Sequence, residues 1–299
     1  MKNFGLLGAA GYIAPKHMKA IKDTGNTLCV ACDISDSVGI IDSYFPEASF
    51  FTEVERFDRH MDKLRGGPDK LDYLSVCTPN YLHDSHIRLG LRNGCDVICE
   101  KPLVINYKNL QYLEKLEQET KNKVYCILQL RLHEDIINLK KMVENAPPNQ
   151  RFKVKLCYIT SRGVWYDYSW KAQEHLSGGI LANIGIHFFD MLMWVFGRPK
   201  ESGVTPNPYS NTVEGTLSLE RADVDWFLSC NYSHLPQEVV ERGQRTYRRI
   251  TIDEDELEFS GGFADLHTKS YEKILNGTGY GIEDVKPSID LITELRYEL

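Results

Sequence analysis

The chain has 299 residues, 42% of them hydrophobic, which is enough to bury the cores of two ordinary domains. Its formal net charge is -7 and no run is rich in lysine or arginine, so non-specific binding to nucleic acid is not expected. The sequence begins without a charged, apolar leader, and no uninterrupted apolar stretch approaches the roughly 18 to 20 residues that span a bilayer, so we expect a soluble, cytoplasmic protein without a membrane partner.

The first 130 residues alternate short apolar runs with stretches of helical length. Five runs have the composition of buried strands: FGLLG, TLCVACD, DYLSVCTP, DVICEKP and VYCILQL. Between the last two, Leu110, Leu113 and Leu116 recur at helical spacing after Asn106, a residue suited to the N-cap. This alternation is typical of a parallel α/β sheet, so residues 1–130 are predicted to form a doubly wound domain.

The pattern changes after about residue 150. The runs RFKVKLCYIT, NTVEGTLSLE, VDWFLSCNYS and RRITIDEDELEF resemble antiparallel strands, and several alternate polar and apolar residues. A helical region is expected at 175–196, and two helices, separated near GTGYG and Pro287, are expected in the tail 265–299. Residues 131–299 are therefore predicted to form an α+β domain with an open-faced sheet, whose final helices can pack back on the first domain. The uncovered face predicts a homodimer or a homotetramer.

The eight cysteines lie mostly inside strand-like runs, as Cys77, Cys99, Cys126 and Cys157 do. Small buried thiols are common at such positions, so we interpret them as reduced core residues. Cys29 and Cys32 form a CxxC pair, but no second pair follows and their side chains would point to opposite faces of a strand. No metal site is predicted.

A small-residue turn, GAAGYIA, follows the first predicted strand. Gly8, Gly11 and Ala14 have a GxxGxxA spacing, which lets a backbone approach a pyrophosphate at a helix N-terminus. By itself the turn is equally compatible with simple βα packing. Asp33, at the end of the second strand, adds a carboxylate that can accept hydrogen bonds from ribose hydroxyls and repel a 2′-phosphate, which favours NAD over NADP. The alternative for Asp33 is a solvated turn residue.

Polar residues also follow two later strands, at the edge where open α/β sheets bind ligands. Thr78, Pro79 and Asn80 end one strand, and Glu100, Lys101 and Pro102 end the next. We expect Lys101 to project into a cleft between the two domains and to be functional, the alternative being a salt bridge of Glu100 with Lys101 or a neighbour. His83 and His86 are expected to be helical, and for His86 a capping or packing role is preferred.

These motifs carry a family resemblance that covers nearly the whole chain. GAAGYIAPKH, Asp33, CTPNYLH and EKP, followed by SGGILANIGIHFFD, resemble the Gfo/Idh/MocA oxidoreductases, which pair a Rossmann domain with an open-faced sheet domain. The resemblance implies that Lys101 and His187 are catalytic, with Asn183 where the family often has aspartate. The implied NAD contacts are Gly8, Ala10, Gly11, Tyr12, Ile13, Asp33, Thr78, Pro79, Asn80, His83, Glu100, Lys101 and Gln129.

Within this family, LQLRLH, RGVWYDYSWK, NIGIHFFD and the tail most resemble the UDP-N-acetylglucosaminuronate 3-dehydrogenases (WlbA/WbpB type) of surface-polysaccharide and O-antigen synthesis. Aromatic side chains of RGVWYDYSWK can stack on sugar or uracil, and its cations can bind pyrophosphate or carboxylate, although a subunit interface or domain core is an alternative for each aromatic. Arg131 is a candidate for the uronate carboxylate. The substrate contacts expected are Lys101, Arg131, Arg162, Tyr166, Trp170, Lys171, Asn183 and His187.

The resemblance implies oxidation of the C3 hydroxyl of a UDP-linked amino sugar uronate to a 3-keto sugar nucleotide. A neutral Asn183 cannot act as a general base, so Lys101 or His187 would take the proton, with Asp190 able to orient His187. The alternative for His187 is a core histidine that caps an apolar helix. Some relatives reoxidise NADH in place with 2-oxoglutarate. Two other functions stay open: a dehydrogenase of inositol or another sugar, and a non-catalytic NAD-binding sensor.

Overall fold

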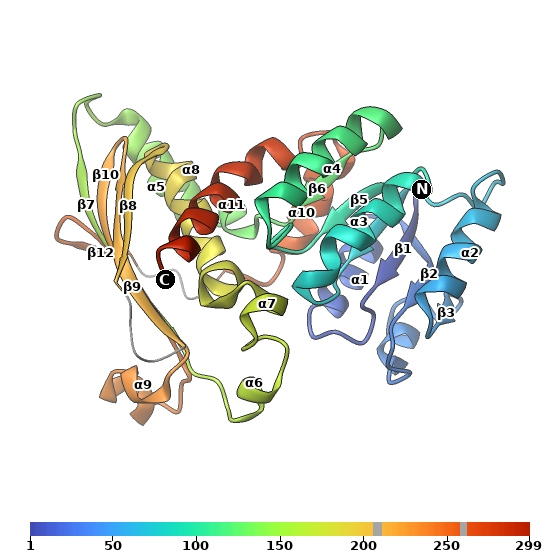
Figure 1. Cartoon of the computed structure of the whole chain (residues 1–299), viewed down its shortest axis with the longest axis horizontal. Helices are drawn as coiled ribbons and strands as arrows, with labels where there is room; N and C mark the ends of the chain where they lie inside the picture. The colour runs from blue at the N-terminus through green and yellow to red at the C-terminus, as the bar shows by residue number, and fades with distance from the viewer. Residues whose placement is uncertain (206–210, 258–261) are drawn as a thin grey trace. The chain divides into compact units, whose positions relative to one another are not determined.

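The computed structural model describes residues 1–205, 211–257 and 262–299, which form two compact units (Figure 1). The first unit comprises Met1–Gln129 and Ala264–Lys286, and the second comprises Leu130–Phe263 and Pro287–Leu299. The chain therefore leaves the first unit after Gln129, returns to it at Ala264 and leaves it again after Lys286. Each unit is described below by itself.

The first unit is built on a six-stranded parallel sheet with the order β3-β2-β1-β4-β5-β6. Its strands are β1 (Asn3–Leu7), β2 (Thr27–Cys32), β3 (Ser49–Phe51), β4 (Tyr73–Val76), β5 (Asp96–Cys99) and β6 (Val124–Cys126). This is the strand order of a Rossmann fold. The five predicted strands are confirmed. The edge strand β3 was not predicted, because three half-exposed residues carry too little apolar pattern to detect.

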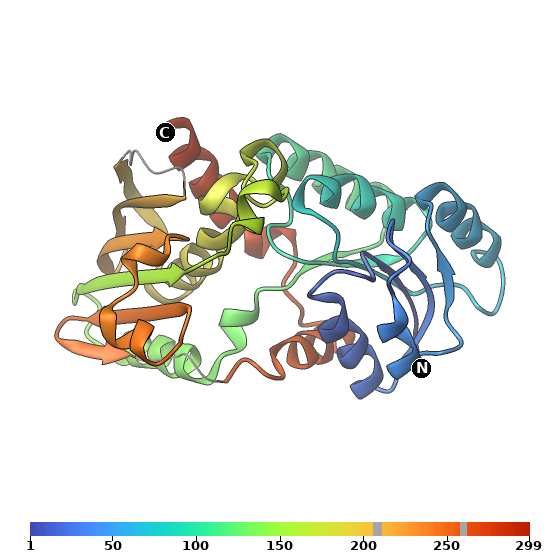
Figure 2. The ribbon, with the colours of Figure 1, turned by 90° about the horizontal axis from the view of Figure 1, so that it is seen from below.

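Helices connect these parallel strands. They are α1 (Ala14–Asp23), α2 (Val54–Leu64), α3 (His83–Arg92) and α4 (Tyr107–Thr120), with short turns η1 (Gly39–Ser43), η2 (Asn80–Leu82) and η3 (Gln129–Leu132). The predicted cap of α4 is confirmed, because the Asn106 side chain accepts a hydrogen bond from the backbone N–H of Lys108. Leu110 and Leu113 are fully buried. The returning segment adds α10 (Leu266–Leu275), which packs against α1 (Figure 2).

The second unit contains a six-stranded sheet with the order β12-β11-β7-β10-β9-β8. Its strands are β7 (Phe152–Thr160), β8 (Pro199–Thr205), β9 (Thr212–Leu219), β10 (Ala222–Ser229), β11 (Thr246–Ile252) and β12 (Asp255–Leu257). β7 and β10 pair in parallel and the other neighbours pair antiparallel, so the prediction of a mainly antiparallel sheet is confirmed. β8 was not predicted. Glu258 and Phe259, in the last predicted run, lie outside the described residues.

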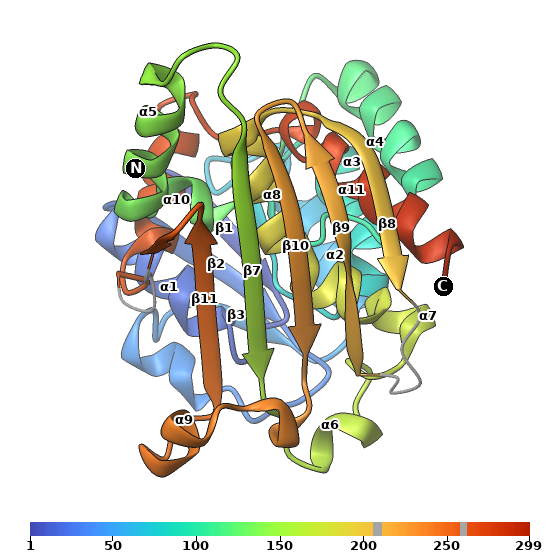
Figure 3. The same cartoon turned by 90° about the vertical axis from the view of Figure 1, so that its left-hand side faces the viewer.

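One face of the second sheet is covered by helices and the other carries charged residues (Figure 3). The helices of this unit are α5 (Glu134–Asn145), α6 (Trp165–Tyr168), α7 (Glu174–Ser177), α8 (Ile186–Phe196) and α9 (Gln237–Glu241), with turns η4 (Leu181–Gly185) and η5 (Tyr232–His234). On the inner face, Trp226 of β10 meets Phe189 of α8 edge to face, with ring centroids 5.2 Å apart. Along β7, Lys153 and Lys155 point to the outer face and alternate with the buried Phe152, Val154 and Leu156.

Two details of the helices bear on the sequence prediction. Within the 23 residues Glu174–Phe196, the most apolar 18-residue window has a mean hydropathy of 1.5, so by length and composition alone this segment could cross a membrane, although Asn183, His187 and Asp190 interrupt its apolar run. Instead, 72% of its most apolar window is buried in the protein, where α8 is the core helix of the second unit. In the tail, Pro287 does not separate two helices. It lies inside α11 (Ile282–Tyr297), and the break before that helix falls at the predicted GTGYG.

Candidate active site

The turn between β1 and α1 requires glycine at its first position. Gly8 has a φ of 89°, and a Cβ added there would lie 2.7 Å from the carbonyl carbon of Cys77. A Cβ on Gly11 would lie 3.1 Å from the carbonyl oxygen of Gly8. Ile13, the N-cap residue of α1, provides no capping side-chain hydrogen bond. The turn thus forms a close-packed cradle of the kind that holds a dinucleotide pyrophosphate, and the residues present fit that group.

Asp33 follows β2, and its carboxylate braces the same turn. Oδ2 accepts the backbone N–H of Ala10 at 2.9 Å, and Oδ1 accepts the backbone N–H of Ser35 at 2.9 Å. A carboxylate can accept about four hydrogen bonds, so these two contacts leave capacity for the ribose hydroxyls. Tyr12, at the outside of the turn, is 90% exposed. The segments predicted to contact the pyrophosphate and the ribose are therefore joined directly by the hydrogen bond from Ala10 to Asp33.

The turns after β4 and β5 are joined by a buried histidine. His83 places Nδ1 2.7 Å from the carbonyl oxygen of Pro102 and Nε2 2.8 Å from that of Thr78. Burial lowers the pKa of His83, and a neutral ring can donate to only one of these carbonyls. The ring thus lies between the two turns and, when neutral, donates a hydrogen bond to the backbone of one of them. Asn80 is also buried, and Gln129 begins η3.

His86 has the packing role preferred from the sequence. Its Nδ1 lies 2.9 Å from the Thr78 hydroxyl, and burial lowers the pKa of His86 to about 4. The ring is therefore neutral at physiological pH and acts as a buried hydrogen-bonding partner of the turn after β4.

Glu100 and Lys101 directly follow β5. Glu100 Oε1 is bonded by Nε2 of His17 at 3.0 Å and Nε2 of His267 at 2.9 Å, and its Oε2 accepts the Lys101 backbone N–H at 3.3 Å. Glu100 is thus hydrogen-bonded by two histidines of the same unit, which sequence reasoning did not select, in place of the salt bridge considered as an alternative. Lys101 itself is partly exposed.

In the second unit, Arg131 forms a buried two-point ion pair with Asp190. Its Nε donates to Oδ2 at 2.9 Å and Nη2 donates to Oδ1 at 2.7 Å, while the Ser288 hydroxyl also donates to Oδ1 at 2.9 Å. Arg131 is 8% exposed and Asp190 is 3% exposed. Since the ion pair uses two of the five guanidinium N–H groups, Arg131 is anchored in the core by Asp190. Ser288 was missed because a lone serine in the tail carries no sequence signal.

His187 is the second residue of α8 and Asn183 lies in η4 before it, and both are partly exposed. Phe188 and Leu192 of the same helix are buried. The Tyr166 hydroxyl hydrogen-bonds to the side chains of Asn183 and Cys230, and burial raises the pKa of Tyr166. The partial exposure of His187 differs from the fully buried position that a core histidine would occupy.

The RGVWYDYSWK segment includes α6, and its side chains have two different environments. Tyr166 is buried, whereas Trp165 is 54% exposed and Arg162 is exposed. Lys171 Nζ lies 5.7 Å from the ring centroid of Trp165 and 5.6 Å from that of Trp170. Burial and the charge of Arg162 lower the pKa of Lys171. The segment therefore presents cations and aromatic faces together, as predicted for a sugar-nucleotide contact.

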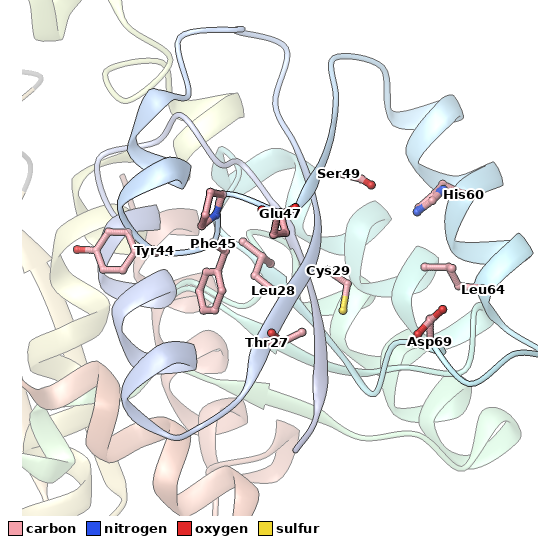
Figure 4. A pocket seen from close by; sticks show the side chains of 12 residues that line it. Thr27, Leu28, Cys29, Tyr44, Phe45, Glu47, Ser49, His60, Leu64 and Asp69 are labelled. Carbon is pink, nitrogen blue, oxygen red and sulfur yellow. The ribbon is translucent and has the colours of Figure 1, made fainter.

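A separate hollow of about 490 Å³ lies beside the amino ends of β2 and β3 in the first sheet (Figure 4). It is lined by Thr27 and Cys29 of β2, Ser49 of β3, His60 of α2 and neighbouring residues. These strand residues lie toward the amino ends of β2 and β3, whereas the glycine turn and Asp33 follow carboxyl ends. None of the predicted site residues lines this hollow.

All eight cysteines are free thiols, and most of them are buried, in agreement with the predicted reduced core residues. Burial raises the pKa of Cys32 to about 11 and that of Cys95 to about 12. Such thiols remain protonated at neutral pH and are poor nucleophiles.

The strand order and the glycine turn with Asp33 are those of a dinucleotide-binding unit, and family comparison identifies the class as oxidoreductase. The model "Oxidoreductase family, NAD-binding Rossmann fold" matches residues 2–127, and "Oxidoreductase family, C-terminal alpha/beta domain" matches residues 150–237. The chain belongs to the Gfo/Idh/MocA oxidoreductase family, and its first unit is an NAD-binding Rossmann domain.

Among solved structures, the WlbA (WbpB) dehydrogenase from Thermus thermophilus is 44% identical to this chain, with a TM-score of 0.95 over 99% of this chain and 95% of that one. It has been solved with NAD and alpha-ketoglutarate, and with NAD and UDP-GlcNAcA. The WlbA dehydrogenase from Bordetella pertussis is 18% identical, with a TM-score of 0.80 over 99% of this chain and 95% of that one, and shares the fold.

Curated relatives are more distant. Inositol 2-dehydrogenase of Rhizobium meliloti is 27% identical over 227 residues, which is 73% of this chain and 60% of the relative. D-glucoside 3-dehydrogenase of Escherichia coli is 28% identical over 149 residues, which is 47% of this chain and 40% of the relative. The matched regions thus span 40% to 60% of these two relatives.

Proposed function

We propose that this oxidoreductase oxidises the C3 hydroxyl of UDP-N-acetylglucosaminuronic acid to the 3-keto sugar nucleotide. The observation that carries this proposal is the 44% identity over 99% of the chain to a dehydrogenase solved with NAD and UDP-GlcNAcA. The positions of Lys101, Asn183 and His187 support it, since they supply titratable and hydrogen-bonding groups after β5 and at the start of α8.

In the proposed reaction the C3–H bond breaks with its electron pair and the C3 hydroxyl loses its proton. Bound NAD+ would accept the hydride, so the products are a C3 ketone and NADH. Lys101, or His187 acting with it, takes the hydroxyl proton, and in the reverse direction the same group returns it to the oxyanion. Asn183 is neutral and orients a substrate hydroxyl without taking its proton.

The second unit supplies the proposed substrate contacts. Lys171 and Arg162 offer positive charge to the pyrophosphate, and Trp170 offers a ring face to the sugar or uracil. Tyr166 holds Asn183 through its hydroxyl. For Arg131, which Asp190 anchors at two points, we keep the proposed contact with the uronate carboxylate.

We further propose that a 2-oxo acid such as 2-oxoglutarate reoxidises NADH without its release. The hydride would move from NADH to the 2-oxo carbon and a proton to its oxygen, giving a 2-hydroxy acid and NAD+. The Thermus thermophilus relative solved with NAD and alpha-ketoglutarate supports this extension. Lys101 and His187 could supply the proton to the reduced oxo acid.

The setting of the reaction is also part of the proposal. A 3-keto product of this kind would serve the synthesis of a diacetamido uronic acid sugar for surface polysaccharide such as O-antigen. Eight free thiols fit a reducing compartment, which supports a cytoplasmic location. The charged outer face of the second sheet, with Lys153, Lys155, Asp223 and Asp225, is proposed to pack against a second copy in a homodimer or homotetramer.

The proposed substrate can be tested with purified protein and NAD+. UDP-N-acetylglucosaminuronate is compared with UDP-N-acetylglucosamine and myo-inositol, and nicotinamide absorbance and product mass are followed with and without 2-oxoglutarate. A loss of about two daltons confined to the uronate is expected from removal of a hydride and a proton. Turnover that requires the oxo acid would support recycling in place.

The second candidate is a dehydrogenase of inositol or another sugar. The 27% identity with inositol 2-dehydrogenase over 73% of this chain favours it. Oxidation of myo-inositol but not the uronate in the same assay would replace the proposed substrate and retain the hydride chemistry. Absence of redox change with every sugar, together with NAD binding, would instead support the sensor function considered from the sequence.

A further inference from the structure

A buried chain of hydrogen bonds lies behind the Glu100–Lys101 turn in the first unit. The Ser75 and Tyr271 hydroxyls are 2.7 Å apart, and the Tyr271 hydroxyl is 2.7 Å from His17 Nδ1. His17 Nε2 and His267 Nε2 then lie 3.0 Å and 2.9 Å from the same oxygen, Glu100 Oε1. Ser75 and the aromatic members of this chain are at most 3% exposed, and Glu100 is 8% exposed. The Glu100 chain thus links the sheet interior to the turn that carries Lys101.

Two members of this Glu100 chain come from the segment that returns to the first unit after the second unit. His267 and Tyr271 belong to α10, which packs against α1, the helix of His17 (Figure 2). The His17 and His267 rings meet edge to face, with centroids 5.1 Å apart. The family models match residues 2–127 and 150–237, so α10 lies outside both matched segments. Helix α10 therefore brings to the Glu100 chain two side chains from outside both matched segments.

The proton positions in the Glu100 chain follow from which atoms can donate. An ionised Glu100 Oε1 only accepts, so both histidine Nε2 atoms must carry hydrogen. His17 Nδ1 is then an acceptor for the Tyr271 O–H, and the Tyr271 oxygen accepts from Ser75. His267 Nδ1 is buried without a hydrogen-bond partner, which costs less for a bare nitrogen in a neutral ring than for a charged N–H donor. Every hydrogen is thus assigned with both rings neutral and Glu100 negative.

The electrostatic environment agrees with this assignment for Glu100 and for His17. Burial alone would raise the pKa of Glu100, but the hydrogen bonds from His17 and His267 hold it well below its usual range. Burial lowers the pKa of His17. The other titratable groups facing Glu100 are Cys77 and Cys99, whose pKa values burial raises, and His83, whose pKa burial lowers. Of the side chains at this turn, Glu100 and Lys101 therefore carry the charges.

We propose that His17, His267 and Tyr271 are positioning residues that hold Glu100 as a fixed carboxylate and thereby set the position and proton affinity of Lys101. Glu100 Oε2 accepts a hydrogen bond from the Lys101 backbone N–H, so the anchored carboxylate fixes the backbone of the lysine directly. Its negative charge favours the protonated form of the adjacent lysine. The inference rests on the proposed role of Lys101 in proton transfer, but the protonation states of the histidines are independent of the substrate.

A metal ion is the competing interpretation, because His17, Glu100 and His267 offer ligand atoms within 4.8 Å of one another. Nitrogen-to-oxygen separations of 2.9 Å and 3.0 Å are ordinary hydrogen-bond lengths and complete the coordination of Oε1 without an ion. A metal would require both Nε2 atoms to lose their hydrogens. The two interpretations therefore predict opposite protonation of the same nitrogens.

The first test uses the wild-type protein with NAD and needs no sugar substrate. Histidine labelled with ¹⁵N is followed by NMR from pH 6 to pH 8, with signals assigned by His17→Gln and His267→Gln. We expect both rings to carry hydrogen on Nε2, and the His17 ring to stay neutral across this range. Loss of the Nε2 hydrogen from either ring, titration of His17 near pH 6.5, or one equivalent of tightly bound metal by elemental analysis would overturn the proposal.

The second test compares hydroxyl deletions and histidine replacements by activity. Tyr271→Phe is matched with Tyr73→Phe, a deletion in the same core cluster but outside the Glu100 chain. His267→Leu is matched with His267→Gln, which keeps an N–H donor. We expect Tyr271→Phe and His267→Leu to lower kcat by about tenfold or more, with KM for NAD within about twofold, and to shift the pH midpoint of kcat by roughly half a unit.

The matched variants separate positioning from folding. We expect Tyr73→Phe to retain the wild-type pH profile and His267→Gln to recover part of the lost kcat. If Tyr271→Phe and His267→Leu lower the melting temperature but leave kcat and its pH midpoint unchanged, the Glu100 chain has only a structural role and the proposal is wrong. If no sugar is turned over, the substrate proposal fails while the NMR measurement still decides the histidine states.

Discussion

At the scale of single residues, the cofactor turn depends on the absence of a side chain. Gly8 combines a φ of 89° with a carbonyl carbon 2.7 Å from any added Cβ. Gly25 has a similar φ of 72° but nothing within 4 Å of its Cβ position. Both glycines have a positive φ, which strains any other residue, but only Gly8 lacks room for a Cβ, so the pair separates the two reasons for glycine.

Gly8→Ala is therefore expected to destabilise the fold and abolish measurable NAD binding, because the methyl group must push the turn away from Cys77. Gly25→Ala carries only the conformational cost, about 1 kcal/mol, and should bind NAD normally. Fluorescence titration of NAD and thermal unfolding check both variants. Equal NAD affinity in Gly8→Ala and wild type would contradict the requirement for a close turn.

Lys101→Ala should retain NAD affinity and lose turnover by about 10² to 10⁴, the usual contribution of a positioned acid or base. The lysine follows β5 but is not part of the glycine turn or the Asp33 contacts. Lys108→Ala, at an exposed position in α4, is the charge-matched control. Near-normal turnover of Lys101→Ala would remove the lysine from the proposed mechanism.

At the scale of elements, α8 is tied to η3 and α11 by one buried carboxylate. Asp190 of α8 accepts hydrogen bonds from Arg131 and Ser288. Apart from Asp190, the buried side chains of α8 are aromatic or aliphatic. A charge in such a core is tolerated because its partner is held at two points, so removing one partner leaves the other uncompensated.

Asp190→Ala is expected to lower the free energy of unfolding by about 3 to 5 kcal/mol, because it leaves the Arg131 guanidinium buried without its carboxylate. Asp223→Ala breaks an exposed pair with Arg151 and should cost less than about 1 kcal/mol. Urea unfolding of both variants gives the comparison. Similar losses in the two would show that burial does not determine the value of the Asp190 pair.

At the scale of the whole molecule, buried neutral histidines couple stability to pH. Burial lowers the pKa of His17, His83 and His86, the last to about 4. In the unfolded chain a histidine takes up a proton near pH 6.5, whereas these folded-state rings do so only at lower pH. Below about pH 6.5 the unfolded state therefore binds more protons, and stability falls with decreasing pH. The depressed pKa of Glu100 acts separately, at pH values below its ordinary unfolded range.

For His86 alone, a shift from 6.5 to about 4 corresponds to roughly 2 kcal/mol of stability lost between pH 7.5 and pH 5. His86→Asn, which keeps a polar partner for Thr78, should reduce this pH-dependent loss by a similar amount. His175→Asn, at an exposed position, should leave it unchanged. Urea unfolding at the two pH values measures the difference, and an unaltered pH dependence in His86→Asn would refute the assigned burial effect.

Local patterns predicted much of the fold and several features of the site. Alternating apolar runs identified five strands of the first sheet, and Asn106 with Leu110 and Leu113 identified α4 and its cap. The three-residue β3 was not detectable, because a short half-exposed edge strand has almost no hydrophobic period. Pro287 was interpreted as a break because proline interrupts a helix interior, yet α11 continues through it.

By itself, the sequence determined the class of each unit, the glycine turn, Asp33 and the placement of Lys101 after a strand, because these depend on residues close together in the chain. Only the tertiary structure decided that His17, Glu100, His267 and Tyr271 meet, and that Asp190 binds Arg131 and Ser288. Those contacts join residues from well-separated parts of the chain. Local periodicity carries no information on such partners, because they are chosen by packing after the chain has folded back on itself.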